Sequence, residues 1–169
     1  SNYKIYAGNC VAILTTPLFV SMIRKIPLYK FFKYYLKHPS KFRAISFILF
    51  KLLGYSVFKN SSPLYKLALL SLKMIRVHLS DLNAHLKDRI WIDGDNFSLA
   101  DITWMVLLHR LEEVQLIDIL CSENNNLKAY YNRLKERESF AKGINNFNHD
   151  SIKTGIERLK LEMSINKDL

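Results

Sequence analysis

Apolar side chains recur at intervals of three and four along most of the chain, which is the pattern of amphipathic α-helices. The clearest stretch begins at Pro63 and ends near Asp88. Pro63 suits a first helical position, where its missing N–H would have no partner, and Ser61 or Ser62 can cap that end. The apolar positions of this stretch are Leu64, Ala68, Leu72, Ile75, Leu79, Leu82 and Leu86. The spacing predicts a long helix with one apolar face.

A second helix is predicted after the turn sequence Asp93-Gly94-Asp95-Asn96. Ser98 can accept a hydrogen bond from the N–H of Asp101, whose carboxylate can return one to the N–H of Ser98. This reciprocal pair is a capping box, with Asp in place of the commoner Glu. Phe97 before the cap and Ile102 inside the helix have the spacing of a hydrophobic staple. We interpret all four residues as structural.

The stretch that follows is apolar at nearly every helical angle. Its apolar residues are Leu99, Ile102, Trp104, Met105, Val106, Leu107, Leu108 and Leu111. A helix of this kind that is too short to span a membrane is expected to be buried at the centre of a domain.

Shorter helices are predicted on either side of these two. One covers 125–136 with Leu127, Tyr130, Tyr131 and Leu134 on its apolar side. Ser139 can cap another, and a last helix is expected at about 151–164, within the tail 148–169. Before residue 60 we expect helical stretches at 3–15, 18–36 and 41–58, with Pro17 and Pro27 either kinking one long helix or separating two. No segment has the pattern of a strand, so the fold class is all-α.

Length and composition agree with one helical domain over 1–169, since the chain has 169 residues and a mass of 19.8 kDa. Two cysteines form no disulfide framework and match no zinc spacing, which favours a reducing, cytoplasmic compartment. The longest apolar runs, 10–23 and 45–58, fall short of the roughly 20 residues that a membrane-spanning helix needs.

The formal net charge of +10 is unevenly distributed. Residues 1–80 contain thirteen Lys or Arg and no acid, and Lys30, Lys33 and Lys37 lie in a run of aromatic residues there. Cations among aromatic side chains predict peripheral association with an anionic membrane surface or an acidic partner. The alternative is a solvated basic face that only keeps an apolar segment soluble. No nucleic-acid motif is present, so no nucleic-acid partner is expected.

Few residues have the pattern of a catalytic or metal site, and we expect neither in this chain. His109 has only Glu112 and Glu113 at ligand spacing, so a core histidine is the preferred interpretation. The two adjacent glutamates diverge by about 100° on a helix and make a poor acid–base pair. Cys10 lies in an apolar segment and is expected to be an inert thiol, unless a helix start lowers its pKa.

The residues 91–102, from Trp91 through the turn to Ser98-Leu99-Ala100-Asp101-Ile102, resemble the C-terminal helical domain of glutathione transferases. The segment 127–140 is similar to a later part of the same family. Within the family, Leu108-His109-Arg110-Leu111 and the Tyr130-Tyr131 pair are most similar to the ganglioside-induced differentiation-associated branch. The resemblance covers about 63–145.

This resemblance implies a glutathione transferase C-terminal-domain-like helical bundle. The family's N-terminal thioredoxin-like half, which binds and activates glutathione, is absent from this chain, so the chain holds no cofactor and is expected to be inactive alone. What remains would supply an apolar pocket for an electrophile and part of a homodimer contact. The resemblance makes Tyr3, Tyr6, Asn9 and Cys10 candidates for lining that pocket. The alternative is a non-catalytic helical module that docks through its basic half.

Overall fold

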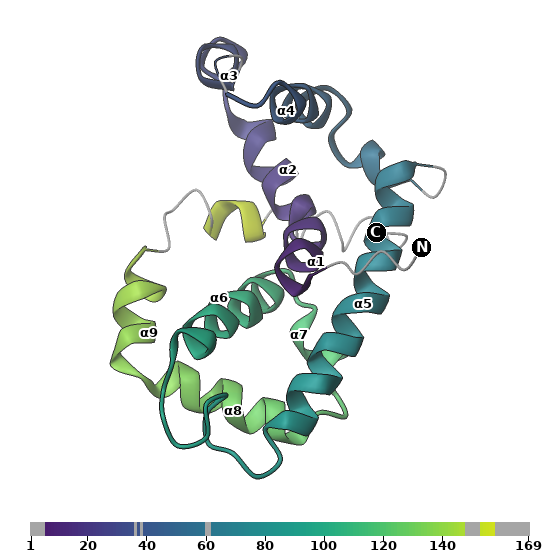
Figure 1. Cartoon of the computed structure of the whole chain (residues 1–169). Helices are drawn as coiled ribbons and strands as arrows, with labels where there is room; N and C mark the ends of the chain where they lie inside the picture. The colour runs from purple at the N-terminus through teal and green to yellow at the C-terminus, as the bar shows by residue number, and fades with distance from the viewer. Residues whose placement is uncertain (1–5, 36, 38, 60–61, 148–152, 158–169) are drawn as a thin grey trace. The chain divides into compact units, whose positions relative to one another are not determined.

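A computed structural model describes residues 6–35, 37, 39–59, 62–147 and 153–157 (Figure 1). These residues form helices and turns, and their only β-type pairings are two isolated bridges, Trp91 with Gly94 and Asp93 with Asn96. The all-α prediction is therefore confirmed. The elements are α1 (Ala7–Leu14), α2 (Thr16–Lys25), α3 (Leu28–Tyr35), α4 (Lys41–Leu53), η1 (Gly54–Phe58), α5 (Pro63–His85), α6 (Leu99–Glu113), α7 (Ile117–Cys121), α8 (Asn125–Glu136), α9 (Glu138–Gly143) and η2 (Asn145–Phe147), where η marks a 3₁₀-helix.

The chain divides into two compact units, which are described separately. The core unit comprises Ser1–Thr15 and Leu69–Asn148, and the basic unit comprises Thr16–Ala68 and His149–Leu169. By sequence the core unit has eleven Lys or Arg and eleven acids, while the basic unit has fourteen and four. The whole formal charge of +10 therefore belongs to the basic unit.

The core unit is organised around α6, which contacts α1, α7 and α8. The predicted apolar face of α5 is buried in this core through Ile75, Leu79, Leu82 and Leu86. Asn83 of α5 also caps α8, because its Oδ1 accepts the backbone N–H of Leu127 at 3.1 Å. The start of α8 is therefore held by a side chain of α5, 44 residues earlier in the chain, and no local sequence pattern predicts such a cap.

Helix α8 has the predicted bounds, and α5 has the predicted start but ends at His85, before the expected Asp88. α5 begins at Pro63, and of the two serines considered it is Ser62 that caps it, accepting the N–H of Tyr65 at 3.1 Å. α8 covers Asn125–Glu136 and buries the four side chains expected of its apolar face. Spacing and end signals were sufficient for both.

The prediction that α6 is buried on all sides is wrong. Asp101, Met105, Leu108 and Leu111 face the core, but the opposite face leaves Leu99 77% exposed and Ile102 and Val106 partly exposed. The described core unit covers only one side of α6, so an apolar surface remains on the other. The sequence shows which faces of a helix are apolar, but it does not show how many of those faces other helices cover.

Other boundaries differ from the predictions for local reasons. Of the two alternatives for the prolines, Pro27 separates two helices, as one of them stated, whereas Pro17 lies in the first turn of α2. The expected helix 41–58 ends at Leu53 because Gly54 has a left-handed φ of 57°, and a 3₁₀-helix follows. Ser139 lies inside α9, whose N-cap is Arg137, and α7 was not predicted.

The two ends of the chain are only partly described. Of the expected helix 3–15, α1 begins at Ala7, and residues 1–5 lie outside the described residues. Of the tail, residues 153–157 are helical and the rest of 148–169 lies outside. Taken singly, no helix among the described residues is long and apolar enough to cross a bilayer. Helices α1 and α2 would pass that test only as a bent pair, judged by length and composition.

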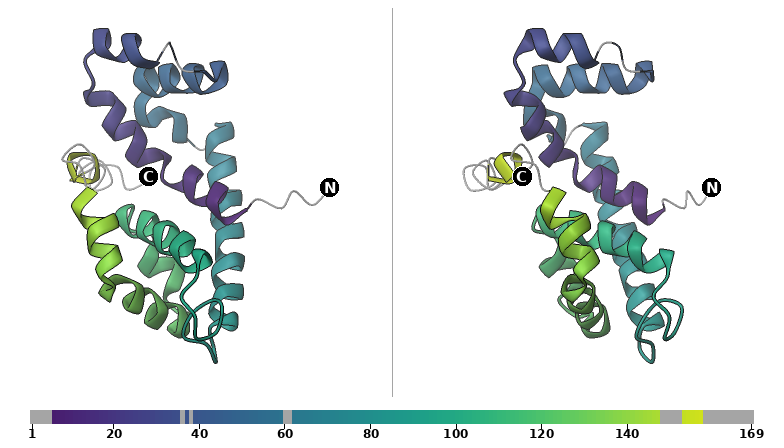
Figure 2. Two further views of the ribbon diagram at one scale, coloured as in Figure 1. Left: turned by 60° about the vertical axis from the view of Figure 1, so that its left-hand side comes forward. Right: turned by 90° about the vertical axis from the view of Figure 1, so that its left-hand side faces the viewer.

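An aromatic column holds α3 on its neighbours in the basic unit. Phe31 is fully buried and stacks on Tyr35 with ring centroids 4.8 Å apart. Tyr35 meets Phe47 of α4 edge-on at 5.1 Å, and Phe47 lies 5.1 Å from Phe19 of α2. Helices α3 and α4 lie side by side in Figures 1 and 2. The column therefore fixes which face of α3 points inward.

Lys51 of α4 closes the end of α2. Its ammonium donates to the carbonyl oxygens of Ile23 (3.2 Å), Arg24 (2.8 Å) and Ile26 (2.6 Å). Carbonyl groups in the last turn of a helix have no partners within the helix, and a cation is favoured at that end of the helix dipole. The charge that interrupts the apolar run 45–58 is thus part of the fold.

We predict that Lys51→Met lowers the free energy of unfolding by about 1–3 kcal/mol, because these carbonyl oxygens lose a charged donor at a half-buried site. Lys41→Met, at an exposed position of the same helix, is the matched control and should change it by less than about 0.5 kcal/mol. Chemical denaturation monitored by circular dichroism measures both. Equal midpoints for the two variants would contradict the role of Lys51.

Candidate functional site

The predicted pocket residues do not share one environment. Tyr3 lies outside the described residues, while Tyr6 and Asn9 are exposed at the start of α1. Cys10 is fully buried in the core, where burial raises the pKa of its thiol and outweighs a backbone hydrogen bond that lowers it. Its sulfur is therefore protonated at neutral pH and faces core side chains. Of the three candidates that the structure describes, Tyr6 and Asn9 are exposed where a ligand could reach them.

The carboxylate of Asp101 is the most connected polar group of the core unit. Its Oδ2 accepts the backbone N–H of Ser98 at 2.8 Å and the Ser98 hydroxyl at 2.9 Å. Its Oδ1 accepts the backbone N–H of Ile92 at 3.0 Å and the hydroxyl of Tyr130 at 2.8 Å. The reciprocal arrangement of a capping box is present at this helix start. Asp101 thus connects the turn before α6, the first turn of α6 and the middle of α8.

Burial and hydrogen bonding act on Asp101 in opposite directions. Burial raises its pKa, but the hydrogen bonds from Ile92, Ser98 and Tyr130 outweigh that effect, and the net pKa is below the usual value. The pKa of Tyr130 is raised, first by burial and then by the hydrogen bond to Asp101. At neutral pH the pair is a carboxylate and a neutral phenol, which suits a structural bond and not a nucleophile.

The turn 91–96 is held from several sides. Nε2 of His85 donates to the carbonyl oxygen of Ile92 at 2.9 Å, and Arg133 of α8 donates to the carbonyl oxygen of Ile90 at 2.9 Å. Phe97 packs edge-on against Trp91 at 5.1 Å, and the guanidinium of Arg137 lies 3.6 Å from the Phe97 ring centroid.

The predicted staple would join Phe97 to Ile102. Phe97 packs against the core, but Ile102 is partly exposed, on the open face of α6. The Phe97 ring contacts Trp91 of the turn and the guanidinium of Arg137, which lies between α8 and α9.

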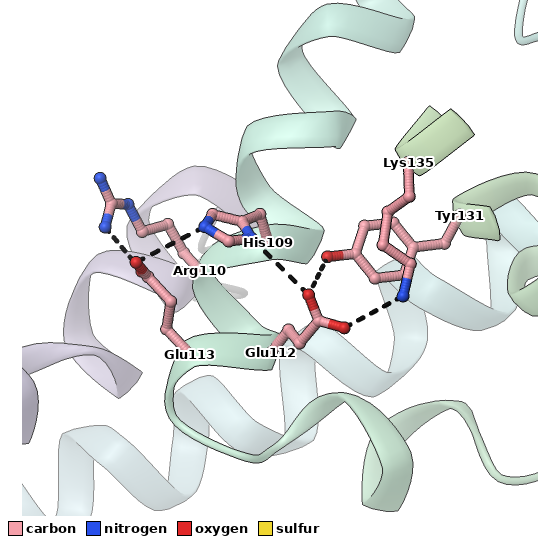
Figure 3. Close-up of polar contacts among 6 residues, drawn as sticks. All are labelled: His109, Arg110, Glu112, Glu113, Tyr131 and Lys135. Atoms are coloured by element: carbon pink, nitrogen blue, oxygen red, sulfur yellow. Dashed lines mark hydrogen bonds and ion pairs between the residues drawn. The ribbon is translucent and has the colours of Figure 1, made fainter. Parts of the chain in front are cut away.

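A second polar cluster lies at the other end of α6 (Figure 3). Glu112 accepts the Tyr131 hydroxyl at 2.7 Å and the Lys135 ammonium at 3.1 Å, both from α8. Glu113 pairs with Arg110 at 2.6 Å. His109 lies between the glutamates, with Nδ1 3.6 Å from Glu112 and Nε2 3.5 Å from Glu113.

These glutamates approach opposite nitrogens of His109 and do not converge on one point (Figure 3). Within the part of the chain that the structure describes, no three His, Cys, Asp or Glu side chains are grouped as metal ligands. The ring of His109 also packs edge-on against Phe140, with centroids 5.6 Å apart. His109 therefore lies at the boundary of the core, between two acids.

A hollow of about 220 Å³ adjoins Glu112, between α6, α7 and α8. Its lining residues are Glu112, Ile117, Asp118, Cys121, Leu127, Lys128, Tyr131, Asn132 and Lys135. Burial raises the pKa of Cys121 to about 11 and that of Tyr131 further still. Burial raises the pKa of Glu112 too, but the Tyr131 and Lys135 hydrogen bonds bring it below the usual value. None of these three groups changes protonation near pH 7, so they do not provide an acid–base centre.

We predict unequal losses of stability at the Asp101 site. Ser98→Ala should lower the free energy of unfolding by about 1–2 kcal/mol, the usual loss for a helix cap. Asp101→Ala should lower it by about 3 kcal/mol or more, because donors from three segments lose their acceptor. Asp95→Ala, at an exposed position of the turn, is the control. Denaturation midpoints measure the series, and equal losses for Ser98→Ala and Asp101→Ala would contradict the central role of the carboxylate.

The lowered pKa of Asp101 predicts a pH dependence with a defined sign. The stability it contributes is fully present above the pKa of an unfolded aspartate, about 3.9, and is lost as the pH falls through the lower pKa of the folded state. The difference in unfolding free energy between the wild type and Asp101→Asn should therefore be largest at neutral pH and narrow below about pH 4. Urea denaturation from pH 7 to pH 3 measures it, and a constant difference would refute the assignment.

The chain was compared with known proteins. Residues 71–133, from α5 to α8, match the family described as glutathione S-transferase, C-terminal domain, an all-α domain. A stretch of 66 residues is 47% identical to the tetrachloro-p-hydroquinone reductive dehalogenase of Sphingobium chlorophenolicum, covering 39% of this chain and 26% of that protein. No solved structure matches the chain. The part of the chain that Asp101 connects is thus similar to the C-terminal domain of glutathione S-transferases.

Proposed function

We propose that this chain is the helical, substrate-binding half of a glutathione S-transferase-like protein. The observation that carries the proposal is that the family match, residues 71–133, coincides with the segment joined by Asp101. In this proposal glutathione binds a thioredoxin-like half outside the chain, which lowers the pKa of the glutathione thiol for attack on an electrophile. The helical half supplies the apolar wall against which the electrophile is held. The whole protein would act in the cytoplasm.

The proposed pocket lies at the start of α1. Tyr6 and Asn9 are exposed there, so an aromatic ring and an amide are available to a bound molecule. The matched segment 71–133 does not include α1, so the substrate class is not inherited from the match. The related dehalogenase suggests a halogenated aromatic compound as the first electrophile to try, and similarity to the ganglioside-induced differentiation-associated branch remains a sequence-based hypothesis.

Partners follow from the same proposal. C-terminal domains of this family typically pair with a thioredoxin-like half and often dimerise. The open face of α6, with Leu99, Ile102 and Val106, is an apolar surface that such a half would cover. A homodimer contact is proposed without assigned residues.

We predict that the purified 169-residue chain is not retained by immobilised glutathione and does not conjugate glutathione to a generic electrophile. The reason is that burial raises the pKa of Cys10, Cys121, Tyr130 and Tyr131, so none of these four groups is an activated thiol or phenol. An intact glutathione transferase serves as the positive control for both assays. Conjugation of glutathione by the chain alone would contradict the proposal that glutathione is bound and activated by a half outside the chain.

The reading frame upstream of the chain gives an independent test. A thioredoxin-like sequence in frame before residue 1 would support the proposal, and the joined protein should then bind glutathione. An in-frame start codon directly before residue 1, or an unrelated upstream domain, would overturn it.

A further inference from the structure

Helix α3 carries more apolar side chains than the fold buries. Phe31 and Tyr35 point into the aromatic column of the basic unit. Beside this buried face Leu28 is 55% exposed, Tyr29 70% and Phe32 41%, and the Phe32 ring meets Phe31 edge-on with centroids 5.6 Å apart. At 100° per residue these three lie within an arc of about 100°. Adjacent exposed apolar side chains on a short helix indicate a surface that a membrane or another protein covers.

Lysines border this apolar arc. Lys30 and Lys33 are exposed on α3, and Lys37 is exposed just beyond its end. The Lys30 ammonium lies 5.9 Å from the centroid of the Tyr29 ring, so charge and aromatic side chain are adjacent. We call Leu28, Tyr29, Lys30, Phe32, Lys33 and Lys37 the α3 surface.

The chain segment that contains the α3 surface is cationic, and the four acids of the basic unit all lie in its other segment, 149–169. Residues 16–68 contain ten Lys or Arg and no Asp or Glu. The neighbouring helix α4 also leaves Ile45 and Leu52 exposed. A cationic surface that also exposes aromatic and apolar side chains matches both the negative potential and the interfacial zone of an anionic bilayer.

The geometry points to α3 as a helix that docks reversibly on an anionic lipid surface. Leu28, Tyr29 and Phe32 would enter the headgroup zone, and Lys30, Lys33 and Lys37 would extend along it to lipid phosphates. The aromatic column keeps Phe31 and Tyr35 inside the protein, so docking requires no unfolding of the basic unit. Eight residues of helix and three lysines give weak binding that salt reverses, not permanent anchoring.

Co-sedimentation of the 169-residue chain with vesicles tests this inference. We expect binding to vesicles of phosphatidylcholine with 30% phosphatidylserine and none to pure phosphatidylcholine. Binding should disappear above roughly 0.5 M salt, where screening lengths shrink to a few ångströms. Equal binding to both vesicles, or to neither, would overturn the inference.

Charge-matched variants assign the binding to α3. Each cation near an anionic surface contributes about fivefold in affinity, so Lys30→Gln with Lys33→Gln and Lys37→Gln should weaken binding at least tenfold. The control is Lys66→Gln with Lys73→Gln and Lys87→Gln, three exposed lysines of and beyond α5, which removes the same charge. Equal losses for the two triple variants would show a general charge effect and overturn the assignment to α3.

The apolar contribution needs its own variants. Tyr29→Ser with Phe32→Ser should weaken binding at least tenfold, whereas Leu69→Ser with Val77→Ser, exposed positions of α5, should not. Phe32→Trp should gain a blue-shifted emission and quenching by brominated lipid, relative to the wild type with only Trp91 and Trp104. Absence of that shift in a variant that still sediments with vesicles would refute insertion.

A soluble polyanion is the competing partner. Binding of single-stranded RNA or polyglutamate that depends on Lys30, Lys33 and Lys37, without vesicle binding, would replace the membrane assignment. These assays use no glutathione, so their failure leaves the proposed transferase function standing, and failure of that function leaves the membrane result standing.

Discussion

The core unit depends on one buried carboxylate. A charged carboxyl inside a protein is costly unless hydrogen bonds replace its hydration, and the four bonds to Asp101 do so. The donors come from the turn before α6, from the N-cap Ser98 and from Tyr130 of α8. Because no single segment can satisfy the charge, Asp101 is stable only when turn, α6 and α8 are assembled together. This requirement makes the carboxylate a condition of the fold and not only a helix cap.

The same hydrogen bonds explain why Asp101 and Tyr130 have a structural and not a catalytic role. Strong hydrogen bonding lowers the pKa of Asp101, and burial raises that of Tyr130, so both are locked in one protonation state near pH 7. At the far end of α6, Glu112 and Tyr131 form an equivalent pair. Groups whose pKa values are moved away from neutrality stabilise structure well and transfer protons poorly. This agrees with the proposal that a thioredoxin-like half outside the chain performs the chemistry.

Sequence reasoning succeeded where the determinant is local and failed where it is distant. The bounds of α8, the first residue of α5 and the pairing of Ser98 with Asp101 all follow from side chains within four positions of each other. The Tyr130 bond to Asp101 joins residues 29 apart, and the cap that Asn83 provides for α8 joins residues 44 apart. No spacing rule reaches that far. Likewise, the open face of α6 could not be predicted, because exposure depends on which neighbours are present.

Charge asymmetry illustrates how a sequence signal changes meaning once side chains are placed. Thirteen cations and no acid in residues 1–80 suggested a surface for anions, but the count treats every lysine alike. Lys51 has a structural role, since its ammonium donates to three carbonyl oxygens at the end of α2. Lys30, Lys33 and Lys37 are exposed on or just beyond α3, and the Lys30 ammonium lies 5.9 Å from the ring centroid of the exposed Tyr29. The neighbours of a lysine therefore indicate its role: backbone carbonyl groups around Lys51 identify a structural cap, and an exposed aromatic ring beside Lys30 identifies a candidate recognition surface.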